Sequence, residues 1–168
     1  YSFNRVVRNF VIQGGCPDSV KYFENSPYLL DPEFVDSLGH SYGALGMGRD
    51  DNPKKQSNAC QFYIVNKEQG LPQLDGNYMI FGKIIKGVEV LEAIEKVPTD
   101  NTDTPIDKIP LSVTILHLTK AQLLADTAEM TANMQARGGG ILSTRLVNKS
   151  DELDGYFQIE ARFETCDS

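Results

Sequence analysis

The stretch FNRVVRNFVIQGG, at residues 3–15, decides how the whole chain is interpreted. Its aromatic and β-branched residues predict two short strands, at residues 2–7 and 10–13, and the glycines at its end stop the second strand. Because side chains alternate along a strand, Phe3 and Arg5 share one face. Taken alone, this pattern also fits an exposed arginine above an ordinary core.

Polar and aromatic side chains recur along the predicted strands. Phe10 offers an aromatic wall, and Gln13 places an amide just before the two glycines. In the run SNACQFYI, Gln61 and Tyr63 share one face of a strand. The run LDGNYMIFGK, at residues 74–83, is a turn that leads into another strand. Each segment alone fits the exposed side of any sheet, so their combination and order carry the functional interpretation.

The remaining pattern up to residue 118 favours a mainly β domain. Apolar residues at helical spacing predict one amphipathic helix at residues 87–97. Many short strands with one clear helix are typical of an antiparallel barrel or sandwich. The additional strands are expected at residues 44–48, 61–65, 79–85 and 111–118.

The character of the sequence changes after residue 118. Strong helix formers follow the potential N-cap Thr119 and predict a helix at residues 120–137. Two strands of a hairpin are expected at residues 141–147 and 156–163, after a run of three glycines. We therefore predict two units: a domain at residues 1–118, and an appendage at residues 119–168 made of a helix and a β-hairpin. No catalytic motif is visible in the appendage.

Composition excludes several functional classes. The 168 residues carry a net charge of -7 and a pI near 4.8, with no basic run of the kind that binds nucleic acid. No segment approaches the roughly 20 apolar residues of a membrane span. We interpret the excess of acidic residues as favouring solubility.

The cysteines and histidines give little sign of a metal or disulfide framework. Cys16, Cys60 and Cys166 are odd in number and lack CxxC spacing. Cys60 is interpreted as a small buried apolar residue, with one disulfide between two of the three as the alternative. His40 and His117 have no carboxylate or cysteine neighbour at ligand spacing, so both are expected to be structural.

Together and in this order, the three segments resemble the cyclophilin family. The family pattern F-x-R-V-x-x-x-F-x-x-Q-G-G is matched at every fixed position, and the Q-F-[FY]-I and L-D-G…F-G-K runs follow at suitable spacing. The resemblance covers residues 1–116, and two runs, PKKQSNACQFYIV and DPEFVDSLGHSYGALGMGRD, are more similar to bacterial members. It implies a closed, eight-stranded antiparallel barrel with one or two helices. It also implies peptidyl-prolyl cis-trans isomerase activity without a cofactor or metal.

The resemblance further implies the site residues. Arg5 would stabilise the twisted X-Pro amide, while Gln13 would bind the substrate backbone and orient Arg5. The implied catalytic residues are Arg5, Phe10 and Gln13. The implied substrate-binding residues are Val11, Met47, Gly48, Arg49, Gln61, Tyr63, Leu74 and Tyr78.

The chain departs from the family pattern at four site positions. Tyr78 stands where eukaryotic members carry His, and Gln73 where many carry Trp. Arg49 replaces the usual Asn, and Val11 replaces the common Met. None of these changes removes the Arg, Phe or Gln, so we expect an active enzyme with altered peptide preference and weak binding of cyclosporin-like macrocycles.

The beginning of the chain leaves alternatives open. Family members carry two strands and a helix before the arginine motif, whereas this sequence opens at Tyr1. The sequence is therefore read as a fragment, with its compartment undetermined, or the C-terminal hairpin takes the place of those strands. Either an isomerase that helps unfolded clients or a non-catalytic module that holds proline-containing segments fits this reading. A weaker third view treats the groove as incidental and the acidic surface and helix as a scaffold.

Overall fold

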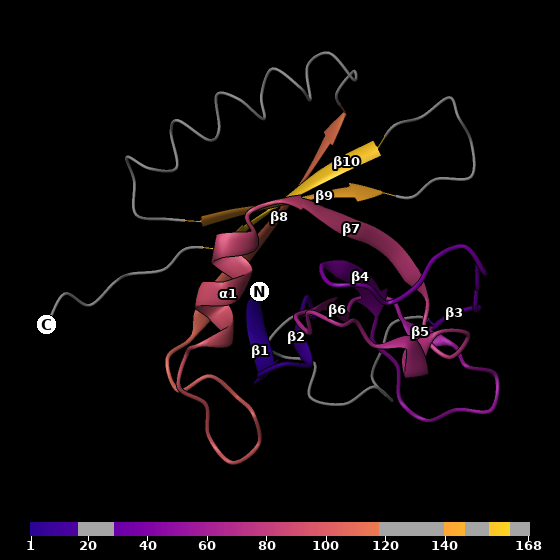
Figure 1. The fold of residues 1–168 in the computed structure, drawn as a ribbon, viewed down its shortest axis with the longest axis horizontal. Coiled ribbons are helices and arrows are strands. Elements are labelled where there is room, and N and C mark those ends of the chain that lie inside the picture. Colours follow the sequence, from indigo (N-terminus) through magenta and orange to yellow (C-terminus); the bar gives the residue numbers. More distant parts are fainter. Residues whose placement is uncertain (17–28, 118–139, 147–154, 162–168) are drawn as a thin grey trace, which may run out of the picture.

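The computed structural model describes residues 1–16, 29–117, 140–146 and 155–161. Eight strands close an antiparallel barrel in the order β1-β2-β6-β4-β7-β9-β10-β8 (Figure 1). These strands are β1 (Ser2–Val7), β2 (Val11–Gly14), β4 (Ala44–Met47), β6 (Phe62–Val65), β7 (Ile80–Lys86), β8 (Ile109–His117), β9 (Gly140–Leu146) and β10 (Gly155–Ala161). The other described elements are the paired β3 (Leu29–Leu30) and β5 (Ser57–Asn58), the 3-10 helix η2 (Pro72–Leu74) and the α-helix α1 (Val88–Glu95). The expected mainly β barrel is confirmed.

The first two strands form the predicted hairpin. The Phe10 N–H donates to the Val7 carbonyl over 3.2 Å, and Asn9 has a φ of 55°, a left-handed conformation that asparagine tolerates well. Phe10 therefore lies in the turn, and β2 begins one residue later than expected. The hairpin fixes Arg5 opposite Gln13.

Alternation along the central strands separates two apolar clusters. Ile12, Leu45 and Ile64 are fully buried in the larger cluster, against which α1 also packs its apolar side. Their strand neighbours, including Val11 and Tyr63, face a second and smaller cluster. This alternation is what gives the sheet two buried faces.

Helix α1 confirms the amphipathic pattern but is shorter than expected. It begins after Gly87, whose φ is 87°, and ends at Glu95. Its buried residues are Val90, Leu91 and Ile94. The helix covers one part of the core, and the described ranges contain none with the length and apolar character needed to cross a membrane.

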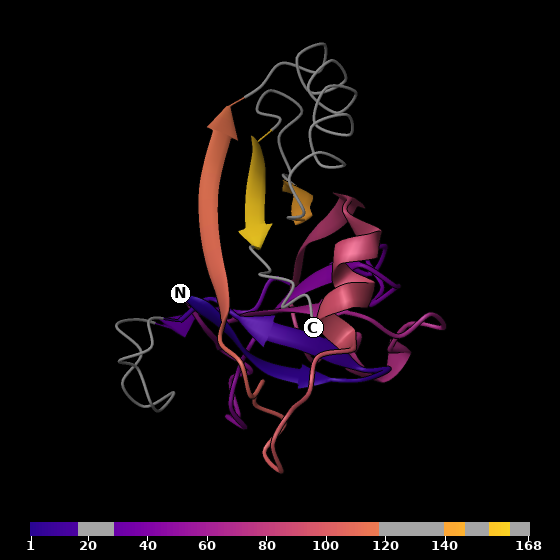
Figure 2. The same cartoon turned by 90° about the vertical axis from the view of Figure 1, so that its left-hand side faces the viewer.

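The C-terminal hairpin continues the sheet. Strand β9 pairs with β7, and β10 pairs with β8 along its whole length, as Figure 2 shows for the long β8 strand and its neighbour. The hairpin thus occupies the space between β7 and β8, which is the alternative that the sequence left open. A domain boundary after residue 118 stays a prediction. The expected helix at 120–137 lies outside the described residues, as does the expected turn at 148–155 apart from Gly155, which begins β10.

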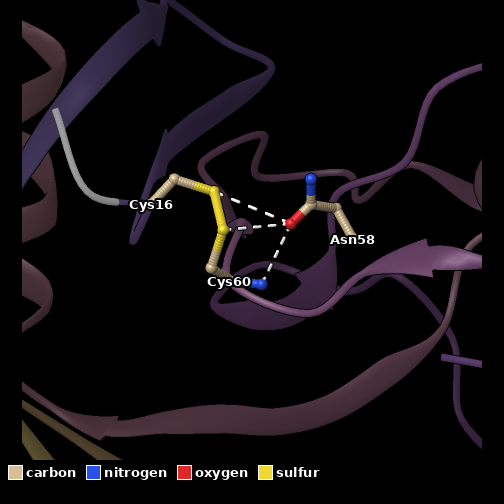
Figure 3. Close-up of a disulfide and its surroundings, with 3 residues drawn as sticks. All are labelled: Cys16, Asn58 and Cys60. Atoms are coloured by element: carbon tan, nitrogen blue, oxygen red, sulfur yellow. Dashed lines mark hydrogen bonds between the residues drawn. A yellow bond between two sulfur atoms is a disulfide. The ribbon is translucent and has the colours of Figure 1, made fainter. Parts of the chain in front are cut away.

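A disulfide joins Cys16 to Cys60, with 4.8 Å between their Cα atoms (Figure 3). The interpretation of Cys60 as a free buried thiol is therefore wrong, and the disulfide alternative holds. The side-chain oxygen of Asn58 lies 3.0 Å from Cys60 Sγ and accepts the Cys60 N–H over 3.0 Å. The two cysteines are 44 residues apart in the sequence, so no local spacing predicted that they pair.

Candidate functional site

One cavity of about 300 Å³ gathers most of the predicted site residues. It opens over the outer face of β1, β2 and β6, next to the segment that contains η2. Every predicted site residue except Met47 and Gln61 lines it. The lining comprises Arg5, Phe10, Val11, Gln13, Gly48, Arg49, Tyr63, Leu74 and Tyr78.

The floor of the cavity is a row of residues in register. Arg5 lies opposite Gln13, Gln13 lies opposite Tyr63, and Tyr63 lies opposite Gly46 on four neighbouring strands. Paired residues of adjacent strands project from the same face of a sheet. A Cβ atom on Gly46 would overlap the Tyr63 ring, so the glycine makes room for that ring. The strand register therefore brings an arginine, an amide and an aromatic ring together.

Gln61 and Met47 stand beside the cavity. Gln61 is only 9% exposed, and a Cβ atom on Gly48 would come within 3.2 Å of its side chain. The Gly48 N–H donates to the Gln61 carbonyl over 2.8 Å, and the Met47 N–H donates to the Met79 carbonyl over 2.9 Å. Gln61 thus packs behind Gly48, which lines the cavity, and Met47 is the residue that precedes it in the chain.

Arg5 lines the cavity, and among the described residues its guanidinium donates one hydrogen bond. Its Nη2 atom lies 3.4 Å from Asp103 Oδ2, and the two side chains are 40% and 46% exposed. An ion pair this exposed contributes about 0–1 kcal/mol. Asp103 is the hydrogen-bond partner of the guanidinium among the described residues, and the orientation of Arg5 by Gln13 stays a prediction.

Arg49 forms a fixed part of the opposite wall. Its side chain is 9% exposed, and its Nε donates to the Asn77 carbonyl over 2.9 Å. Its Nη1 donates to the Asp50 carbonyl over 2.9 Å. The guanidinium carbon lies 4.6 Å from the centre of the Tyr78 ring, which is a cation–π geometry.

A buried histidine lies behind the aromatic wall. His40 Nε2 is 2.8 Å from the Tyr63 hydroxyl, and His40 Nδ1 is 2.5 Å from Asp75 Oδ1. Burial raises the pKa of Tyr63, and the nearby Tyr78 and Asp75 add to this effect. Hydrogen bonds from the His40 side chain and main chain lower the pKa of Asp75.

No carboxylate stands at ligand spacing from His40 in the sequence, yet His40 has a carboxylate partner in the fold. Asp75 is 35 residues away in the sequence, and only the fold brings it to the imidazole. Across the described ranges, no group of three or more His, Cys, Asp and Glu residues is placed to hold a metal ion.

Comparisons with known proteins relate this chain to one family of enzymes. The family model described as cyclophilin type peptidyl-prolyl cis-trans isomerase/CLD matches residues 1–117. An Arabidopsis thaliana relative, peptidyl-prolyl cis-trans isomerase CYP18-2, is 36% identical over 65% of this chain and 65% of its own length. A Bos taurus relative, named probable inactive peptidyl-prolyl cis-trans isomerase-like 6, is 42% identical over 59% of this chain and 32% of its own length.

A similar fold occurs in a solved structure. A Cryptosporidium parvum cyclophilin type peptidyl-prolyl cis-trans isomerase, crystallised in the presence of the dipeptide Ala-Pro, matches with a TM-score of 0.53 and 33% identity. The match covers 64% of this chain and 68% of that chain. The chain thus spans just under two thirds of the first Arabidopsis relative and slightly more of this structure.

Proposed function

Because the chain belongs to the family of cyclophilin type peptidyl-prolyl cis-trans isomerases, we propose that it catalyses rotation about X-Pro peptide bonds. The observation that carries the proposal is the row of Arg5, Gln13 and Tyr63 along the floor of the cavity. A half-exposed arginine lines a cavity that has aromatic and aliphatic walls. Such a site accommodates a pyrrolidine ring and places a positive charge beside it.

The reaction needs no covalent chemistry. An X-Pro amide rotates slowly because its C–N bond has partial double-bond character, with a barrier of roughly 18–20 kcal/mol. In the twisted transition state the prolyl nitrogen regains a lone pair. A guanidinium directed at that nitrogen stabilises the twisted state more than either planar isomer, which lowers the barrier. Arg5 suits this role because it stays charged and has a fixed donor geometry.

The other residues that line the cavity would bind the peptide. Gln13 would hydrogen-bond the substrate backbone, because its amide lies on the floor between Arg5 and Tyr63. Main-chain groups at Gly48 and Arg49 would contact the peptide from the opposite wall. The apolar contacts with the pyrrolidine ring come from Phe10, Val11, Tyr63, Leu74 and Tyr78.

The proposed clients are exposed X-Pro segments of unfolded proteins, and neither a cofactor nor a metal takes part. Gln73 precedes the cavity-lining Leu74 in η2 and offers no indole to a large apolar ligand. We therefore propose weak binding of cyclosporin-like macrocycles. The greater similarity of this sequence to bacterial cyclophilins than to other members of the family also stays a prediction.

A binding module without catalysis is the second candidate function. It is favoured by the relative named probable inactive, which is 42% identical to this chain. In this reading the cavity holds proline-containing segments and the tail serves for docking. The presence of Arg5 on the cavity floor favours catalysis instead, because simple binding of a pyrrolidine ring needs only the apolar walls.

The deciding experiment compares the wild-type chain with Arg5→Ala. We expect the wild type to accelerate cis-to-trans isomerisation of a short Ala-Pro peptide, and the variant to lose roughly 100-fold in kcat/KM, or about 3 kcal/mol of transition-state stabilisation. Arg8→Ala is the matched control, since Arg8 donates to the Glu95 and Lys96 carbonyls away from the cavity. A folded wild type that binds the peptide without accelerating its isomerisation would establish the binding module.

A further inference from the structure

A hydrogen-bonded chain of three side chains lies directly beneath the cavity. It runs from Asp75 through His40 to the hydroxyl of Tyr63, whose ring lines the cavity. The His40 side chain is fully buried, and Tyr63 is 4% exposed. The half-exposed Asp75 carboxylate is the outer end of this chain.

Asp75 determines which nitrogen of His40 carries a proton. Its Oδ1 atom accepts the His40 main-chain N–H over 2.9 Å and lies against Nδ1 of the same residue. An ionised carboxylate only accepts hydrogen bonds, and its lowered pKa keeps Asp75 ionised at neutral pH. Nδ1 of a neutral His40 must therefore be protonated. Nε2 is then an acceptor, so the Tyr63 hydroxyl donates to it over 2.8 Å.

His40 and Tyr63 are both anchored in the fold. The Leu71 N–H donates to the His40 carbonyl over 2.7 Å, just before η2. Tyr63 lies in the centre of β6, with its ring over Gly46 and at 80° to the Tyr78 ring. The Tyr63 hydroxyl is therefore held away from the cavity while the ring stays in its wall.

We infer that His40 is a positioning residue of the proposed isomerase, which holds the Tyr63 hydroxyl so that the aromatic ring, and not the polar tip, meets the prolyl ring of the peptide. This inference rests on the proposed function. The Tyr63 ring contacts the planar substrate and the twisted transition state about equally. Loss of its position therefore weakens binding uniformly and raises KM, whereas loss of Arg5 lowers kcat.

The test replaces His40 in two ways. His40→Leu removes both hydrogen bonds, and we expect KM for an Ala-Pro peptide to rise by roughly 5–10-fold while kcat stays within about twofold. In His40→Gln, the amide can donate to Asp75 and its carbonyl can accept from Tyr63. We therefore expect His40→Gln to keep KM within about twofold of the wild type.

A double-mutant cycle shows whether the effect passes through the hydroxyl. Tyr63→Phe has no hydroxyl to hold, so adding His40→Leu to it should change KM by less than about twofold. An equal effect of His40→Leu in both backgrounds would overturn the inference. So would a folded His40→Leu variant with an unchanged KM.

A measurement on the wild type covers the case in which His40→Leu does not fold. NMR of the 15N-labelled imidazole, recorded at a pH at which the ring is neutral, should show the tautomer protonated at Nδ1, with its signals shifting when the Ala-Pro peptide binds. Protonation at Nε2, or no response to the peptide, would contradict the inference. If the wild type binds the peptide but lacks isomerase activity, the proposed function fails, and the dissociation constant of the peptide takes the place of KM in the same comparisons.

Discussion

Arg49 connects three parts of the cavity wall through one side chain. Its guanidinium binds two main-chain carbonyls, at Asp50 and Asn77, and lies over the ring of Tyr78. A buried cation–π contact of this kind contributes about 0.5–2 kcal/mol. Arg49 thus holds Tyr78 and the loop that precedes it.

We expect Arg49→Ala to raise KM for an Ala-Pro peptide by roughly 3–10-fold, because Tyr78 and the Asn77 main chain lose their common anchor. The value of kcat should change little, since Arg49 is not directed at the rotating bond in our proposal. Steady-state kinetics over a range of peptide concentrations separates the two constants.

Lys54→Ala is the matched control for Arg49→Ala. Lys54 carries the same charge on an exposed side chain and is not among the residues that line the cavity. The control should keep KM within about twofold of the wild type. If both variants raise KM equally, the effect comes from a general loss of positive charge and not from the contact with Tyr78.

At the scale of elements, the pairing of β2 with β6 organises the site. Gly14 lies opposite Phe62, and the disulfide between Cys16 and Cys60 continues the same register two positions further. Gly15, between them, has a φ of 106°, and a Cβ atom there would come within 2.5 Å of the Cys60 carbonyl. The cross-link therefore closes the end of the ladder that carries Gln13 and Tyr63.

Reduction of this disulfide should lower the free energy of unfolding by about 2–4 kcal/mol, because it frees a long loop in the unfolded chain. The ladder keeps its four residue pairs, so kcat/KM of the folded protein should change by less than about threefold. Urea unfolding with and without dithiothreitol measures the first quantity, and the isomerase assay measures the second.

The Cys16→Ser/Cys60→Ser variant controls for other effects of the reductant. It should unfold at the urea midpoint of the reduced wild type and should not respond to dithiothreitol. A further shift on reduction of this variant would show that another thiol, and not this pair, determines the stability.

At the scale of the whole molecule, the barrel closes through strands that lie far apart in the sequence. The β9–β10 hairpin pairs with β7 on one side and with β8 on the other. Ile84 in β7 and Leu111 in β8 are both part of the larger core cluster. Removing the hairpin would leave two unpaired strand edges next to these buried side chains.

We therefore expect a chain that ends at residue 118 to lose its cooperative urea transition and to aggregate, as followed by circular dichroism and light scattering. The predicted domain boundary after residue 118 gives the opposite expectation, namely a truncated chain that folds alone. A cooperative transition in the truncated chain would support that boundary and show that the hairpin is dispensable.

The sequence by itself determined most of the longer elements and the site residues that they are predicted to carry, whereas the short β3, β5 and η2 lie in segments expected to be loops. Period-two alternation identifies the strands, helical spacing identifies α1, and the motif at residues 3–15 identifies Arg5 and Gln13. These features depend on residues a few positions apart, which is the range over which backbone periodicity determines the direction of a side chain.

Only the tertiary structure decided which distant residues meet. The carboxylate of Asp75 contacts the imidazole of His40, and Cys16 pairs with Cys60. No local spacing in the sequence predicts either contact. The same holds for the position of the hairpin between β7 and β8. Strand order and register follow from packing and pairing over the whole sheet, where many partners satisfy the same local pattern, so the neighbours of a residue are known only after the barrel has closed.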